Sequence, residues 1–289
     1  MTQPAIVVRD LRKSYGDLKA VDGVTCEIAF GECFALLGPN GAGKTTVTEI
    51  LEGYRDRDSG SVEVLGADPA SGDRAWKSQL GIVLQSDRDL GDLTVSEAVH
   101  HFSSYYPHPR DPDEVIAAVG LTEKAASRNE KLSGGQRRRL DVALGIIGRP
   151  RVLFLDEPTT GFDPEARRDF WTLIDELKAE GTTILLTTHY LEEAEHLADR
   201  VAVMSRGRIV ACDTPALLGG RQTGQARVSW LEDGQPREEW TTEPTRVVTA
   251  LSTRFDGEIP SLTVDRARLE DTYLALLDGD RYANAGDSE

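Results

Sequence analysis

The sequence predicts an α/β fold in which helices pack on a parallel sheet. Apolar runs at residues 33–37, 152–155 and 182–188 carry this prediction, because each is short enough for a strand buried on both faces. A helix with a recognisable start follows each run, so that strands and helices alternate along the chain.

The first run leads into a glycine-rich turn that opens a helix at about Val47, and its letters fit the pattern G-x-x-x-x-G-K-T. Glycines permit positive φ and close backbone approach, so consecutive N–H groups and the helix N-terminus can converge on phosphate oxygens. The expected nucleotide-binding residues are Gly38, Pro39, Asn40, Gly41, Ala42, Gly43, Lys44, Thr45 and Thr46.

Two side chains of this loop have further expected roles. Lys44 is expected to reach the β- and γ-phosphates and to act in catalysis, and the Thr45 hydroxyl is expected to bind Mg²⁺. A glycine-rich turn with an incidental lysine is a poor alternative, because every fixed position of the pattern and both flanking elements agree. The fold class is therefore predicted to be a P-loop NTPase core.

Composition limits the partners. The 289-residue chain carries a net charge of −16, which argues against a nucleic-acid partner. Its three cysteines include no C-x-x-C pair, so we expect neither disulfides nor a cysteine zinc site, and a reducing compartment is favoured. No apolar run approaches the roughly 20 residues that span a bilayer, and residues 1–10 lack a signal-peptide layout. Any membrane role is expected to come through another chain.

An antiparallel β subdomain is expected before the core. Short strands are predicted at residues 6–8 and 24–28, with a polar loop between them that carries Tyr15. The Tyr15 ring could stack on an adenine. It could equally be a half-buried tyrosine, and the spacing does not separate the two.

A buried strand predicted at residues 80–85 ends in Gln85. A glutamine at the carboxyl end of a strand beside a phosphate loop can complete a Mg²⁺ shell through its carbonyl oxygen. Taken alone, Gln85 would be an ordinary surface residue.

The strand pattern disappears over about 86–131, where we predict a helical insertion. Thr94 and Glu97 form a capping-box pattern for a helix over 95–105. With the helix that follows, this insertion makes a helical subdomain of about 86–150.

A second glycine turn, residues 132–136, opens that following helix, with Ser133 as its expected N-cap. It is a second potential anion site. The arginines at 137–139 could suggest nucleic acid, but a solvated helix face is the favoured interpretation.

Acidic residues and a histidine end the other two predicted strands. Asp156 suits a Mg²⁺ shell, and Glu157 could polarise a water that attacks the γ-phosphate. Asp-Glu-Pro is also a common strand exit. His189 could donate to the γ-phosphate, although a lone histidine at a strand end is usually structural. Asp163 is expected to cap the next helix, which runs to Lys178.

With these residues in view, the chain resembles the nucleotide-binding subunit of an ATP-binding cassette (ABC) transporter. The stretch Leu132, Ser133, Gly134, Gly135 and Gln136 matches the family signature in full, and it is more specific than the phosphate loop. Residues 5–213 carry the whole set of family positions, namely Tyr15, 38–45, Gln85, the signature, Asp156, Glu157, Asp163 and His189.

The resemblance implies that two subunits close head to tail around two ATP molecules with Mg²⁺. Ser133 and Gly135 of one subunit would then contact the γ-phosphate held by Lys44 of the other. A single cassette in one chain makes a homodimer the expected assembly. Phe162 stands where the family more often has leucine, an apolar exchange of little consequence.

We expect a nucleotide-binding domain over 1–213 and a small α+β accessory domain over 214–289. The latter contains a plausible hairpin at Asp233 and Gly234 and a final helix over 269–277. This short tail, with the run Arg-Arg-Arg-Leu-Asp-Val-Ala after the signature, resembles the drug and antibiotic exporter branch (daunorubicin-resistance-like, ABC-2 type).

The branch implies an ATPase that drives efflux of a drug-like or lipophilic compound through a separate integral membrane permease. The subunit would lie peripherally at the cytoplasmic face of the cell membrane, and the helical insertion would dock on the permease. The main alternative is a soluble cassette ATPase acting on a nucleic acid or ribosome complex. It predicts coiled-coil insertions, a zinc module, tandem cassettes or basic faces, which the sequence does not show. A GTPase would need an Asn-Lys-x-Asp motif, which is also absent.

Overall fold

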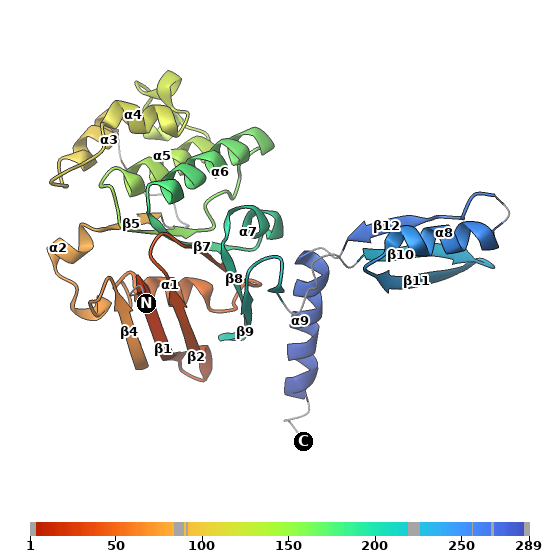
Figure 1. Ribbon diagram of the computed structural model, residues 1–289. Coiled ribbons are helices and arrows are strands. Elements are labelled where there is room, and N and C mark those ends of the chain that lie inside the picture. Colours follow the sequence, from red (N-terminus) through yellow and green to blue (C-terminus); the bar gives the residue numbers. More distant parts are fainter. Residues whose placement is uncertain are drawn as a thin grey trace. The chain divides into compact units, whose positions relative to one another are not determined.

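The computed structural model describes residues 4–83, 90, 92–218, 226–255, 257–266 and 269–285. They form two compact units, Met1–Val210 and Ala211–Glu289. Figure 1 labels helices and strands of both units.

The first unit begins with a three-stranded antiparallel sheet in the order β2-β1-β4. Its strands are β1 (Ile6–Tyr15), β2 (Leu18–Ile28) and β4 (Ser59–Val64). The two predicted strands are confirmed within β1 and β2, but both are longer than predicted. The predicted polar loop is wrong, because Tyr15 is the last residue of β1 and pairs with Leu18. The pairing shifts register around Asp10, whose φ is 47°, and such bulges break the alternation on which a sequence-based strand prediction depends.

The central sheet has six strands in the order β5-β6-β7-β3-β8-β9. They are β3 (Cys33–Leu37), β5 (Leu80–Val83), β6 (Val152–Asp156), β7 (Thr183–Thr188), β8 (Arg200–Ser205) and β9 (Arg208–Asp213). The pairs β5/β6, β6/β7, β7/β3 and β3/β8 are parallel, which confirms the predicted α/β core.

Both faces of this sheet are covered. Alternate side chains of one strand point to opposite faces, and in β6 Leu153 and Leu155 join one hydrophobic cluster while Val152 and Phe154 join the other. The first cluster continues into α3 to α6, and the second into the antiparallel sheet and α1. Figure 1 shows α5 and α6 on one side of the central sheet and the antiparallel sheet on the other.

The helices of this unit are α1 (Lys44–Leu51), α2 (Arg74–Lys77), α3 (Val95–Ser103), α4 (Pro112–Ala118), α5 (Gly134–Ile146), α6 (Pro164–Ala179) and α7 (Leu191–Leu197). Short 3₁₀ turns lie at Pro69–Ser71, Thr122–Lys124 and Asn129–Lys131. The capping box of Thr94 and Glu97 is present, so the predicted start of α3 is confirmed.

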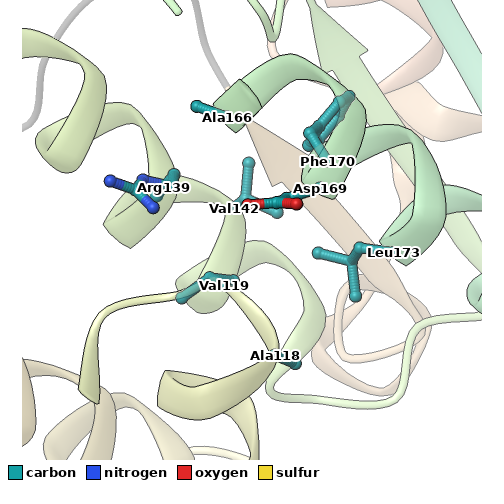
Figure 2. A pocket seen from close by; sticks show the side chains of 8 residues that line it. All are labelled: Ala118, Val119, Arg139, Val142, Ala166, Asp169, Phe170 and Leu173. Atoms are coloured by element: carbon teal, nitrogen blue, oxygen red, sulfur yellow. The ribbon is translucent and has the colours of Figure 1, made fainter. Parts of the chain in front are cut away.

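The helical insertion packs directly on the core. Figure 2 shows the end of α4 beside α5 and α6, with Val119, Val142 and Leu173 between them. The cavity enclosed there is about 10 Å³, room for roughly one water molecule. This junction is therefore a packed contact rather than a ligand site.

The second unit contains a three-stranded sheet in the order β11-β10-β12. Its elements are β10 (Ala226–Glu232), β11 (Gln235–Thr241), α8 (Pro244–Arg254), β12 (Thr263–Arg266) and α9 (Leu269–Ala285). Asp233 and Gly234 join β10 to β11 with φ values of 53° and 73°, which confirms the predicted hairpin. Val228 and Trp230 of β10 pack with Leu251 of α8. Within the described ranges, no helix is both long and apolar enough to cross a membrane.

Candidate nucleotide-binding site

Parallel pairing brings the predicted site residues to one edge of the central sheet. Leu37, the last residue before the phosphate loop, pairs with Thr188, and Asp156 pairs with Thr187 on the other side of the same strand. The carboxyl ends of β3, β6 and β7 therefore meet, and ligands bind at this edge of parallel α/β sheets.

The phosphate loop connects β3 to α1 and depends on glycine at one position above all. Gly43 caps α1 in the left-handed conformation, with φ 101°. A Cβ atom at Gly43 would collide with the carbonyl oxygen of Ala20, so a side chain is excluded by both space and conformation. The first backbone N–H groups of an α-helix have no partner within the helix, so the start of α1 can receive an anion.

Lys44 lies at the centre of the loop with 5% of its surface exposed. Its Nζ donates hydrogen bonds to the carbonyl oxygens of Gly38 at 2.8 Å and Pro39 at 3.2 Å. Burial lowers the pKa of Lys44, and the charges of Glu157 and Asp156 partly oppose that shift. A buried ammonium group held by neutral carbonyls gains from an anion beside it, which is what a phosphate would supply.

Asp156 and Thr45 face each other across the strand ends. One carboxylate oxygen of Asp156, Oδ2, accepts a hydrogen bond from Thr45 Oγ1 at 3.3 Å, and the other accepts one from the Thr187 hydroxyl. No group of three His, Cys, Asp or Glu side chains in the described part of the chain gathers as a metal cluster. One carboxylate with a hydroxyl fits Mg²⁺, which takes few protein ligands and completes its shell with phosphate and water.

Glu157 has an unusual backbone for a non-glycine residue, with φ 47°. Its N–H donates to the carbonyl oxygen of Thr187 at 3.0 Å, which fixes this turn against β7. Its carboxylate oxygen Oε1 lies 3.2 Å from Nδ1 of His189. The two residues expected to act on the γ-phosphate are thus brought into contact from the ends of β6 and β7.

The prediction that the arginines at 137–139 lie on a solvated helix face is wrong for Arg138. Arg138 is 5% exposed and donates to the carbonyl oxygens of Asp156 and Pro158. All three arginines lie one turn before buried residues of α5, so their spacing in the sequence does not single out Arg138. Arg138 holds the chain on both sides of Glu157.

A pocket of about 430 Å³ lies over the phosphate loop. It is lined by residues 40–46, by Glu157, and by Tyr15, Leu18 and Ala20 from the antiparallel sheet. Tyr15 is 41% exposed, and the guanidinium of Arg55 lies 5.4 Å from the centroid of its ring. The sequence does not predict Leu18 and Ala20 as pocket residues. They come from the antiparallel sheet, and no motif around them in the sequence marks a binding role.

The signature residues line a second groove of the same size, about 430 Å³. We call it the signature groove; its walls are residues 133–136 and 160–163, and it reaches Glu157. Ser133 caps α5, accepting from the N–H of Gln136 at 3.3 Å, and Asp163 caps α6. Hydrogen bonds from the N–H groups of Ala166 and Glu165 lower the pKa of Asp163.

Of the predicted site residues, Gln85 lies outside the described ranges.

Comparison with known proteins identifies the family. A family model described as "ABC transporter" matches residues 21–160. The "Nod factor export ATP-binding protein I" of Rhizobium sp. (strain N33) is 40% identical, over 82% of this chain and 80% of that protein. The chain belongs to the ABC transporter family. It is an ATP-binding subunit and an ATPase of that family, as the predicted motifs indicated.

Two further matches fit this ABC subunit. The "Daunorubicin resistance ATP-binding protein DrrA3" of Streptomyces coeruleorubidus is 41% identical, over 79% of this chain and 73% of that protein. A solved structure titled "Structure of ATP binding subunit of ABC transporter" is 26% identical with a TM-score of 0.68, and the match covers 73% of this chain and 90% of that one. The predicted fold class is thereby confirmed.

Proposed function

We propose that this ABC subunit hydrolyses ATP to drive the export of a drug-like or lipophilic compound through a separate membrane permease. The contact between Glu157 and His189 beside Lys44 carries the hydrolytic part of the proposal. The export part rests on the two relatives, whose names describe Nod factor export and daunorubicin resistance.

Each side chain at the sheet edge has a role in the proposed reaction. Lys44 binds the β- and γ-phosphates, and the Glu157 carboxylate orients the attacking water and takes up its proton. His189, held by Glu157, donates a hydrogen bond to the γ-phosphate. Asp156 and Thr45 would hold Mg²⁺, which offsets the negative charge of the phosphate oxygens when bound.

We also propose a head-to-tail homodimer. The phosphate-loop pocket and the signature groove of one chain share Glu157 but otherwise have separate linings. Ser133 and residues 134–136 therefore offer a surface that suits the exposed side of an ATP held by a second copy.

Mixing two inactive variants tests this arrangement. Ser133→Ala impairs only the signature surface, and Glu157→Gln impairs only the hydrolytic carboxylate. In a head-to-tail heterodimer, one ATP lies between the intact Glu157 of the Ser133→Ala chain and the intact signature of the Glu157→Gln chain. Mixing the variants therefore restores part of the ATPase activity. If each chain used its own signature, the mixture would be no more active than the two variants apart.

Copurification tests the transport assignment. Tagged Glu157→Gln protein would be captured from gently solubilised native membranes with ATP and Mg²⁺, and its partners identified by mass spectrometry. We expect a polytopic membrane protein in near-equal amount, which would also support the proposed peripheral location at the cytoplasmic face of the membrane. Recovery from the soluble fraction with ribosomal or nucleic-acid proteins would leave the ATPase standing and overturn the transport assignment.

A further inference from the structure

Glu193 is a fully buried acid that the proposed reaction does not use. It lies on α7, four residues after His189, with 0% of its surface exposed. Neither carboxylate oxygen makes a hydrogen bond of normal geometry within the described residues. Burying such a group costs free energy, so an apolar residue would be the more stable choice for packing alone.

The groups around Glu193 come from both sides of the active site. The hydroxyls of Thr188, which directly precedes His189, and of Thr159, two residues after Glu157, lie close enough to lower the pKa of Glu193. Thr159 is itself fully buried and its hydroxyl has no other partner within the described residues. One carboxyl group is therefore placed between the segment that carries His189 and the segment that leads into the signature groove.

The same cluster includes a cation and two rings. The guanidinium of Arg167, on the first turn of α6, lies 5.1 Å from the ring centroid of Tyr190. The Tyr190 and His189 rings are 4.1 Å apart. Desolvation raises the pKa of Glu193, and the two hydroxyls, Arg167 and His189 oppose this shift. A carboxyl group that keeps its proton can donate to one threonine and accept from the other.

We propose that Glu193 is a positioning residue that ties His189 to Thr159 and, through it, to residues 160–163 in the wall of the signature groove. It touches neither ATP nor the attacking water. In the proposed head-to-tail dimer, residues 160–163 face the ATP of the second copy while His189 faces the chain's own ATP. Glu193 then couples the two ATP sites, and this inference rests on the roles proposed above for His189 and the dimer.

Glu193→Met is the deciding substitution, because methionine matches the length of glutamate without its hydrogen-bonding groups. We expect kcat to fall roughly tenfold to a hundredfold, as for a displaced catalytic group, while KM changes little. We expect the melting temperature to stay the same or rise, since an unsatisfied polar group is replaced by an apolar one. Unchanged kcat in the folded variant would overturn the proposal.

Three comparisons separate positioning from general structure. Glu193→Gln keeps a donor and an acceptor, so it should retain most of the kcat that Glu193→Met loses. Glu192→Met, one residue away with a side chain 76% exposed, removes only a surface ion pair with Arg167 at 3.9 Å. It serves as the matched control and should leave kcat unchanged. Equal losses in Glu193→Met and Glu193→Gln would contradict the proposed contacts.

A double-mutant cycle with His189 tests the coupling itself. If Glu193 acts through His189, adding Glu193→Met to His189→Ala should lower kcat less than twofold further, and full additivity would refute the coupling. His189→Ala with wild-type kcat would instead refute the proposed role of His189. Should Glu193→Met fail to fold, Thr159→Val removes the facing hydroxyl at nearly equal volume and should lower kcat in the same way; an unchanged kcat there would equally overturn the proposal.

Discussion

In both the phosphate-loop pocket and the signature groove, a glycine-rich turn opens a helix, α1 in the first and α5 in the second. The first turn is surrounded by buried charge, with Lys44, Asp156 and Glu157 each at most 9% exposed. In the second turn, the Ser133 hydroxyl is occupied as a helix cap, and Ser133 and Gly134 are exposed.

In the proposed function, this difference corresponds to a division between chemistry at the phosphate-loop pocket and recognition at the signature groove. Charged groups act more strongly on a phosphate where they are withdrawn from water, and Lys44, Asp156 and Glu157 are buried in this way. The signature groove offers capped backbone and a hydroxyl at the surface, which suits contact with a ligand that another surface already holds. Glu157 lines both, so one carboxylate is placed at the boundary between the two.

The largest effect is expected at that shared carboxylate. Glu157→Gln should lower kcat by roughly 10²- to 10⁴-fold, while ATP binding persists and the closed dimer accumulates. Steady-state hydrolysis and size-exclusion chromatography with ATP measure the two outcomes. Glu165→Gln, an exposed acid at the start of α6, is the control. Near-normal hydrolysis by Glu157→Gln would remove Glu157 as the base.

Removing the buried cation should weaken binding rather than chemistry alone. Lys44→Ala loses charged hydrogen bonds to phosphate, so the Kd for ATP should rise roughly tenfold to a hundredfold. Isothermal titration measures this change, with Lys77→Ala on the exposed surface of α2 as the control. An unchanged Kd together with unchanged ATPase activity would refute the role of Lys44.

A stability change is expected where Arg138 joins α5 to the end of β6. Arg138→Met leaves the carbonyl oxygens of Asp156 and Pro158 without their donor, which should cost about 1 to 3 kcal/mol of unfolding free energy. Urea unfolding of the ATP-free protein measures it. Arg137→Met, on the same turn but partly exposed, should cost less. Equal losses would show that helix packing, not these hydrogen bonds, decides the effect.

The smallest effect is expected at the rim of the phosphate-loop pocket. Tyr15→Ala loses one aromatic contact with the base, worth about 0.5 to 1.5 kcal/mol. The KM for ATP should therefore rise roughly two- to tenfold, with kcat unchanged. Tyr15→Phe keeps the ring and should behave as wild type. The same KM in Tyr15→Ala as in the unmodified protein would mean that the ring does not stack on the base.

The sequence predicts most of this site because its residues stand next to local boundaries. Lys44 begins a helix, Asp156 ends a strand and Asp163 caps a helix, so apolar runs and capping residues mark each position. Parallel pairing then brings the separate boundaries to one edge. The fold class follows from the same alternation of strands and helices.

Other features depend on distant packing and leave weaker local marks. Three consecutive arginines look alike in sequence, and only the packing of α5 against the end of β6 turns Arg138 inward. The bulge near Asp10 interrupts the strand pattern and moved the predicted place of Tyr15. Thr187 was read as part of an apolar strand, yet its hydroxyl holds Asp156, because the sheet register alone places them side by side.

The left-handed backbone of Glu157 lowers the stability of the folded chain, whereas its carboxylate is needed for the proposed hydrolysis of ATP. A non-glycine residue in that conformation costs of order 1–3 kcal/mol, and glycine would relieve the cost but remove the carboxylate. Selection for a more stable chain and selection for an active one therefore favour different residues at position 157. A stability screen that ignored activity would drift towards glycine there, and would deliver a more robust protein that no longer turns over ATP.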